Sequence, residues 1–129
     1  RPHGSLAQTV AWTLDAQPRP AAPALRARAQ DLLRGIAHGA DPLDALDAAL
    51  LLQLAGDLPA ALDALRQAQA AGYRDGAYLR ASALLAPLRT QAGFAALLAR
   101  NQADIAAQRA QVRRVGLLPQ ETGAATAAP

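Results

Sequence analysis

The chain contains 129 residues, enough for one domain with a modest hydrophobic core. Hydrophobic residues make up 52% of it and aromatic residues only 3%, with alanine the commonest type, which favours closely packed helices over a sheet. The absence of cysteine excludes disulfides and thiolate chemistry. The net charge is +3, but no run of basic residues is longer than Arg113-Arg114, which argues against a nucleic-acid partner.

Two further features bear on origin and compartment. All 13 basic residues are arginine, and this preference, together with the alanine excess, is typical of a GC-rich bacterial genome. No apolar run approaches the roughly 18 residues that a membrane-spanning helix requires, so we expect no membrane insertion. The sequence leaves open whether the chain works in the cytoplasm or the periplasm, and what its oligomeric state is.

Two helices are expected in the first forty residues. After a loose terminus at 1–4, the pattern SLAQ beginning at Ser5 predicts a capping box and a helix over about 6–16. The stretch QPRPAAP at 17–23 is a proline-rich connector, because proline disfavours the helix interior. A second amphipathic helix is expected over about 24–37.

The next two helices have clear start and stop signals. Asp41 is placed to cap a helix that has Pro42 in its first turn and ends at Gly56. Asp57 is placed to cap the following helix, which ends at Gly72. Because the connection between them is short, we expect an antiparallel helical hairpin.

Two more helices are expected after this hairpin. The first spans about 76–85 and stops before Pro87. The second is long, spans about 91–115, and has Thr90 as its expected cap. The low-complexity stretch 120–129 is expected to be disordered.

These elements predict an all-α fold with about three antiparallel hairpins and a long C-terminal capping helix. The expected organisation is a loose terminus (1–4), a helical domain (5–119) and a disordered tail (120–129). Within the domain we expect a degenerate hairpin (5–40), a repeat (42–75) and a terminal repeat with the cap helix (76–119).

The segment 42–75 has the pattern of a helical repeat. Small residues stand where its two helices must cross closely, at Ala49, Ala61 and Ala68, and leucines fill the hairpin. In its length of 34 residues and in these positions it resembles a tetratricopeptide repeat. Two residues depart from the family: Tyr73 stands where a proline is usual, and Ala45 replaces a bulky aromatic residue.

The following segment, 71–100, is similar to the ending of many bacterial tetratricopeptide proteins. The matching residues are Gly72, Tyr73, Asp75, Leu84, Pro87, Leu88, Arg89, Phe94, Leu97 and Leu98. The resemblance covers about 42–115 and implies a short α-solenoid of the tetratricopeptide type. The alternative is a generic alanine-rich helical bundle.

The resemblance also implies an inner groove lined by the first helix of each pair. The predicted partner-binding residues are Leu43, Leu46, Asp47, Leu50, Gln53 and Leu54, with Arg80 and Arg89 near the continuation of the groove. Alternatively, the first helix or the proline-rich connector covers these leucines, and the sequence leaves this open.

The last helix offers a second surface. Leu98, Ile105 and Val112 recur every seven residues, with Asn101 and Gln108 between them. This spacing is that of half a partner or dimer seam with polar residues that fix its register. A capping helix packed on the preceding hairpin gives the same pattern.

Catalytic, metal and cofactor sites are not predicted. The serines and histidines of the sequence are Ser5, Ser82, His3 and His38. With no cysteine, they supply no nucleophile–base–acid set at a usable spacing. Three aspartates at the start of the helix from Pro42 share a face but lack the loop spacing and glycine of a calcium site. We therefore expect neither enzymatic activity nor a bound metal or cofactor.

The predicted function is protein–protein interaction or scaffolding. A segment of a protein or peptide partner would be bound by apolar burial, in the inner groove or against the last helix. The alternative is a regulatory or spacer C-terminal region of a larger bacterial enzyme or signalling protein, which contacts a domain of its own full-length chain.

Overall fold

The computed structural model describes residues 2–115, with side chains from Ser5 onward. Within this range the chain forms seven α-helices, one 3-10 turn and no strand, so the predicted all-α class is confirmed. The elements are α1 (Pro2–Thr13), α2 (Ala22–Ile36), α3 (Pro42–Leu54), α4 (Leu58–Ala70), α5 (Gly76–Ala81), η1 (Ala83–Leu85), α6 (Ala86–Arg89) and α7 (Phe94–Arg114). The predicted tail, 120–129, lies outside the described residues.

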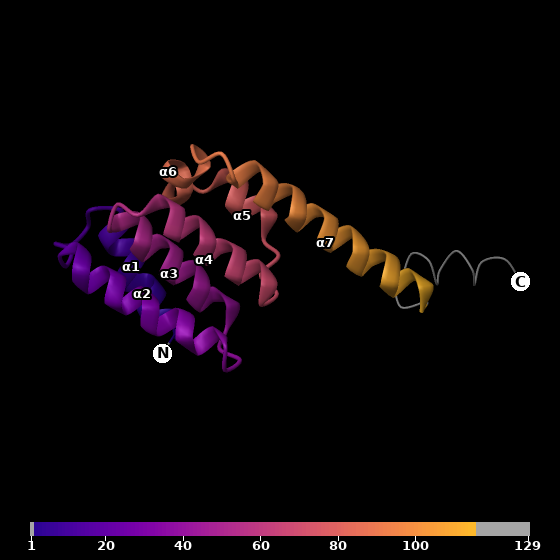
Figure 1. Cartoon of the computed structure of the whole chain (residues 1–129), viewed down its shortest axis with the longest axis horizontal. Coiled ribbons are helices and arrows are strands. Elements are labelled where there is room, and N and C mark those ends of the chain that lie inside the picture. Colours follow the sequence, from indigo (N-terminus) through magenta and orange to yellow (C-terminus); the bar gives the residue numbers. More distant parts are fainter. Residues whose placement is uncertain (1, 116–129) are drawn as a thin grey trace, which may run out of the picture.

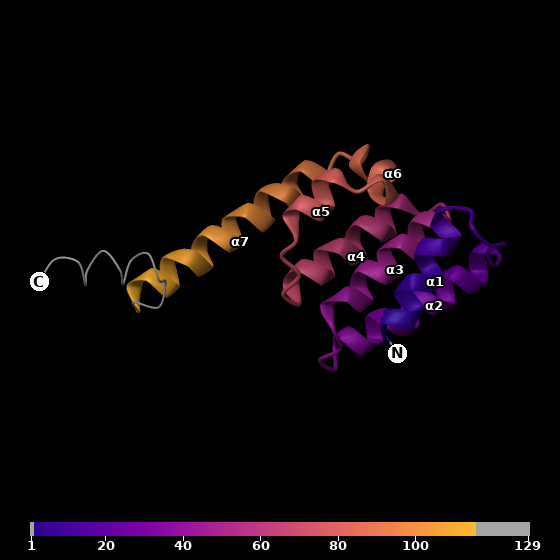
Figure 2. The same ribbon diagram turned by 180° about the vertical axis from the view of Figure 1, so that it is seen from behind.

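The first four helices form a compact bundle, which we call the body (Figure 1). α3 lies at its centre and packs against α1, α2 and α4. In Figure 2, α1 lies on the face of the body that is turned toward the viewer. α1 and α2 pack more closely on α3 than on each other, because the long connector between them separates the two helices. Residues 5–40 therefore do not form a tight hairpin.

The hairpin of α3 and α4 follows from local signals. The Asp41 carboxylate accepts a hydrogen bond from the Leu43 amide at 2.9 Å, and Asp57 accepts one from the Ala60 amide at 3.1 Å, so both predicted caps are confirmed. Between the helices Gly56 has a φ of +85°, a conformation that glycine adopts without strain. The chain thus reverses in two residues and brings α4 back along α3.

Close approach of α3 to its neighbours depends on alanine. Ala45, Ala49 and Ala61 are completely buried, as is Ala68 further along α4. All residues of α3 from 45 to 52 are buried, so this helix has no face toward solvent along its middle. α3 is the core of the body.

Three predicted boundaries were wrong. α1 begins at Pro2, and Ser5 is inside the helix rather than its cap. The helix expected over 76–85 ends at Ala81, because the Ser82 hydroxyl accepts a hydrogen bond from the Leu84 amide and starts the turn η1. Pro87 does not end a helix but stands in the first turn of α6.

The start of the last helix also differs from the prediction. Thr90 does not cap it, because its hydroxyl donates to the Pro87 carbonyl at 2.6 Å, and α7 begins only at Phe94.

Residues 76–115 form the second part of the molecule, which we call the arm. α7 packs against α4, α5 and α6 in its first half and then runs away from the body (Figure 1). The buried residues of α7 are Phe94, Leu97 and Asn101, all within its first eight positions. Its later turns are therefore presented to solvent on most sides.

Candidate functional site

The middle of the predicted inner groove is not open. Leu46, Asp47 and Leu50 are all buried in the core, and Leu50 is completely inaccessible. The cover is formed by α1, α2 and α4, which all pack on α3, and α1 contacts Asp47 directly. The sequence left open whether these residues line an open groove or are covered by other parts of the chain, and in the structure they are covered. Their assignment to a partner-binding surface was therefore wrong.

The other predicted residues are scattered over the molecule. Leu43 and Leu54 are half-buried and pack against the core. The Gln53 amide donates to the Leu84 carbonyl at 2.7 Å and joins α3 to η1. Arg89 donates to the carbonyls of two residues of the segment 79–82, so it closes the end of α5 instead of facing a partner. The last of the set, Arg80, is exposed on α5.

A buried polar contact explains how α1 is held on α3. The Ser5 hydroxyl donates to one carboxylate oxygen of Asp47 at 2.6 Å, and the Thr9 hydroxyl donates to the other. All three side chains are buried. Ser5 and Thr9 are one turn apart on α1, so the two hydroxyls reach one carboxylate together. The contact fixes the position of α1 and uses both Asp47 oxygens inside the fold.

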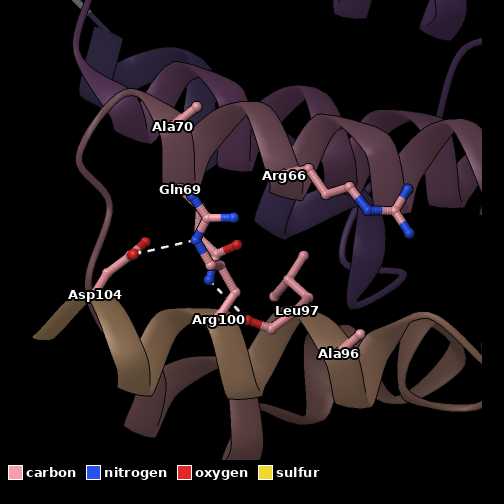
Figure 3. Close-up of a pocket in the computed structure, with 7 residues that line it drawn as sticks. All are labelled: Arg66, Gln69, Ala70, Ala96, Leu97, Arg100 and Asp104. Carbon is pink, nitrogen blue, oxygen red and sulfur yellow. Dashed lines mark hydrogen bonds and ion pairs between the residues drawn. The ribbon is translucent and has the colours of Figure 1, made fainter. Parts of the chain in front are cut away.

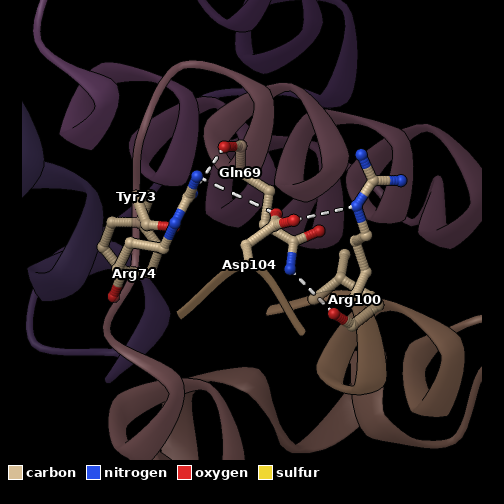
Figure 4. A network of polar contacts seen from close by, with 6 residues as sticks. Gln69, Tyr73, Arg74, Arg100 and Asp104 are labelled. Atoms are coloured by element: carbon tan, nitrogen blue, oxygen red, sulfur yellow. Dashed lines mark hydrogen bonds and ion pairs between the residues drawn. The ribbon is translucent and has the colours of Figure 1, made fainter. Parts of the chain in front are cut away.

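A second polar network joins α7 to the end of α4 (Figure 4). The Gln69 amide donates to the Leu97 carbonyl at 2.7 Å, and Arg74 donates to the Gln69 carbonyl at 2.7 Å. Asp104 lies 3.1 Å from Arg100 and 3.8 Å from Arg74. The charge of Arg74 is therefore balanced within the arm.

Tyr73 lies beside this network, and its side chain is uncharged. Burial of the Tyr73 hydroxyl, reinforced by the nearby Asp75 charge, raises the pKa of Tyr73 far above its usual range. A tyrosine held neutral in this way supplies no base at physiological pH.

A small cavity lies between α4 and α7 on one side of the network (Figure 3). It has a volume of about 250 Å³, and its charged lining residues are Arg66, Arg100 and Asp104. In Figure 3 the side chains of Arg66 and Arg100 point away from each other. Because Arg100 is paired with Asp104, this cavity does not bring two free cations together.

A larger cavity, of about 480 Å³, lies between α5 and α7, and we call it the α5–α7 cavity. Its lining includes Arg80 and Ala77 from α5, and Asn101, Ile105 and Arg109 from α7. Asn101 is completely buried, yet among the described residues neither its amide nitrogen nor its carbonyl oxygen has a hydrogen-bond partner. Buried polar side chains nearly always have a partner; Gln53 and Arg74 each leave one buried atom unpaired but bond through another, whereas both amide atoms of Asn101 are unpaired.

Sequence reasoning found part of this cavity. Arg80 was among the predicted partner-binding residues, and Asn101 stood out as a polar residue in the heptad spacing of the last helix. The spacing gave no sign that Asn101 lacks a partner, because that depends on α5, which is distant in the sequence. The α5–α7 cavity is the candidate functional site.

Comparisons with known proteins add no identification. No family model matches the chain, and neither a curated protein nor a solved structure does. Of the helices between residues 2 and 115, none is both long and apolar enough to cross a membrane. The described residues also contain no cluster of three or more side chains that could hold a metal ion.

Proposed function

We propose that the chain is a protein-interaction module of the tetratricopeptide type, which binds a segment of a protein partner in the α5–α7 cavity. The observation that carries this proposal is Asn101, a completely buried carboxamide with neither atom hydrogen-bonded in the described chain. An unpaired buried amide is costly to the folded chain, and a bound partner removes that cost. The site lies at the end of the helical array and not in the inner groove expected from the sequence.

The repeat assignment is supported by the packing of 42–75. α3 and α4 form an antiparallel hairpin whose small residues, Ala49, Ala61 and Ala68, are completely buried where the helices approach each other. A helical repeat of this kind buries its faces by stacking, and its last unit keeps one face without a neighbour. The α5–α7 cavity lies on the last hairpin-like unit, where such a face is expected.

The exposed length of α7 supports the same location. The helix continues for more than three turns beyond Asn101, and Val115 at its end is 56% exposed. In Figure 1 this part stands clear of the body. A partner seated in the α5–α7 cavity can extend along these turns and bury additional apolar surface.

The proposal is tested by blocking the cavity. A library of displayed random octapeptides is selected on the intact chain, and the affinity of selected peptides is measured with two variants. Ala106→Trp places a large side chain in the cavity lining, whereas Ala99→Trp places the same side chain two turns earlier on α7, at an exposed position outside the lining. We expect Ala106→Trp to weaken binding by about tenfold or more, which corresponds to about 1.4 kcal/mol, and Ala99→Trp to leave it unchanged.

Circular dichroism of both variants serves as the folding control. If selected peptides bind the two variants equally well, the α5–α7 cavity is not the binding site and the proposal fails.

A further inference from the structure

Asn101 has room because its neighbour on α5 is glycine. A Cβ atom built on Gly76 would lie 2.7 Å from the Asn101 carbonyl oxygen and 3.2 Å from the nearest guanidinium nitrogen of Arg80. Real Cβ atoms essentially never show a contact as short as the first, so a side chain at 76 would displace the carboxamide. Gly76 thus keeps a place for Asn101 between α5 and α7, with Arg80 beside it.

The chemistry of Asn101 restricts what can bind to it. A carboxamide presents one acceptor and one donor side by side, and here both are unused. One residue of an extended chain satisfies both at once, because its own main-chain N–H and C=O point to the same side. Extended chain has main-chain N–H and C=O groups available, whereas the main-chain groups of a helix interior bond to each other. An extended peptide therefore fits this site better than a helix.

The charge around the cavity restricts the partner further. Arg80 and Arg109 are exposed and form neither a hydrogen bond nor an ion pair within the described residues, whereas Arg74 is balanced by Asp104. The acidic group in the lining, Asp75, accepts a hydrogen bond from the Tyr78 amide as the cap of α5. The rim therefore presents two arginines that form no ion pair among the described residues and one carboxylate used as a helix cap, so positive charge predominates there.

These charges also disfavour a second copy of the same chain. The chain has a net charge of +3, and the turns of α7 beyond the cavity add Arg113 and Arg114. Two copies that met along this surface would bring like charges together. A partner of opposite charge is favoured instead.

From these observations we infer that the α5–α7 cavity binds an acidic peptide segment in extended conformation. The main-chain N–H and C=O of one residue of the segment pair with the Asn101 carboxamide, and carboxylates on either side of that residue lie on Arg80 and Arg109. This inference rests on the proposed function, because it specifies the partner of the same cavity.

The probe is a fluorescein-labelled octapeptide of alternating glutamate and alanine, with its N-terminus acylated and its C-terminus amidated. Its lysine–alanine counterpart controls for charge, and a version N-methylated along the backbone controls for main-chain hydrogen bonding. Fluorescence anisotropy with the intact chain should show binding of the glutamate peptide, and affinities for the two controls that are at least about tenfold weaker.

Variants of the chain separate the two kinds of contact. Asn101→Leu should weaken binding of the glutamate peptide by about tenfold and leave its preference over the lysine peptide intact. The pair Arg80→Ala and Arg109→Ala should remove that preference. Arg26→Ala, which deletes an exposed arginine of α2 far from the cavity, should change neither quantity. Asn101→Ala repeats the first test with a smaller side chain in case leucine disturbs the packing.

Several results would overturn the inference. The glutamate peptide could fail to bind, bind no better than the lysine peptide, or bind Asn101→Leu and Asn101→Ala as it binds the parent chain. A single-stranded DNA oligonucleotide that bound more tightly and independently of Asn101 would instead indicate a polyanion site. If Ala106→Trp still weakens binding of the library peptides in any of these cases, the cavity remains the interaction site, and only the chemistry assigned to its partner is wrong.

Discussion

Asp47 in the body and Asn101 in the arm are both completely buried, and the two side chains differ in their hydrogen bonding. Asp47 in α3 accepts hydrogen bonds from Ser5 and Thr9 at both of its oxygens. Asn101 in α7 makes none among the described residues. The free energy of a buried polar group depends on whether it is paired, so these two residues have opposite effects on the stability of the chain.

Under the proposed function, this difference distinguishes an internal contact from a binding site. A buried carboxylate that meets two hydroxyls on one helix holds that helix in a single position, and α1 is fixed on α3 in this way. The buried carboxamide of Asn101 faces Gly76 and has no hydrogen-bond partner among the described residues, so it does not fix the position of α7 in this way. The predictions below test the comparison, from the largest expected effect to the smallest.

Leu50→Asp in the body should unfold the chain. The substitution places a charge at the completely buried centre of α3, and we expect a loss of more than about 4 kcal/mol in the free energy of unfolding. Far-UV circular dichroism and urea denaturation measure the effect. Leu14→Asp, at a leucine that is 63% exposed, is the matched control. Native helicity and an unchanged urea midpoint for Leu50→Asp would mean that the inner groove is open after all.

The middle of the chain was predictable because its signals are local. The caps Asp41 and Asp57 act on amides two or three residues away, and the sequence shows them directly. Ser5 has the same local signal, but its hydroxyl bonds to Asp47, 42 residues further along the chain. A contact over such a distance overrides a capping pattern and cannot be read from neighbouring residues.

The inner groove was mispredicted for a related reason. A leucine-rich helix face indicates burial but not the identity of the cover, which here is α1 together with α2 and α4. A signal was present in the sequence, because the stretch from Ala45 to Leu52 is almost entirely alanine and leucine and so apolar all round. Such a helix is expected at the centre of a bundle rather than along a groove.

Asp47→Ala should destabilise the body by about 3 kcal/mol, because it leaves two buried hydroxyls without their acceptor. Urea denaturation measures the loss, and Asp63→Ala, which removes an exposed carboxylate from α4, is the control. Combining Asp47→Leu with Ser5→Ala and Thr9→Val removes every member of the contact and should recover most of the stability. If Asp47→Ala had no effect, the contact would not hold α1, and the two buried polar residues would no longer differ.

Asn101→Leu should have the opposite sign and raise the free energy of unfolding by about 1 kcal/mol, since it removes an unpaired polar group from the interior of the arm. Asn101→Val tests the same effect with less volume beside Gly76. Gln102→Leu, at the exposed neighbouring position, should change stability by less than about 0.5 kcal/mol. A clear loss of stability in both Asn101 variants would mean that the carboxamide is already paired in the free chain, and the case for a partner there would end.

Asp104→Ala should have the smallest effect, a loss of less than about 1 kcal/mol, although Asp104 is at the centre of the network in Figure 4. Its partner Arg100 is largely exposed, so water screens that pair, and the distance of 3.8 Å to Arg74 is near the limit for an ion pair. The urea midpoint of Asp104→Ala should shift no further from that of the parent chain than the midpoint of Asp63→Ala does. This shift should vanish in 1 M salt.

A loss above about 2 kcal/mol would show that ion pairs, rather than the packing of Phe94 and Leu97, hold α7 on the body. The distinction matters for the arm as a binding surface. If apolar packing positions α7, salt leaves the α5–α7 cavity intact. Any fall in peptide affinity with salt then reports the contacts of Arg80 and Arg109 with the peptide and not a displacement of the helix.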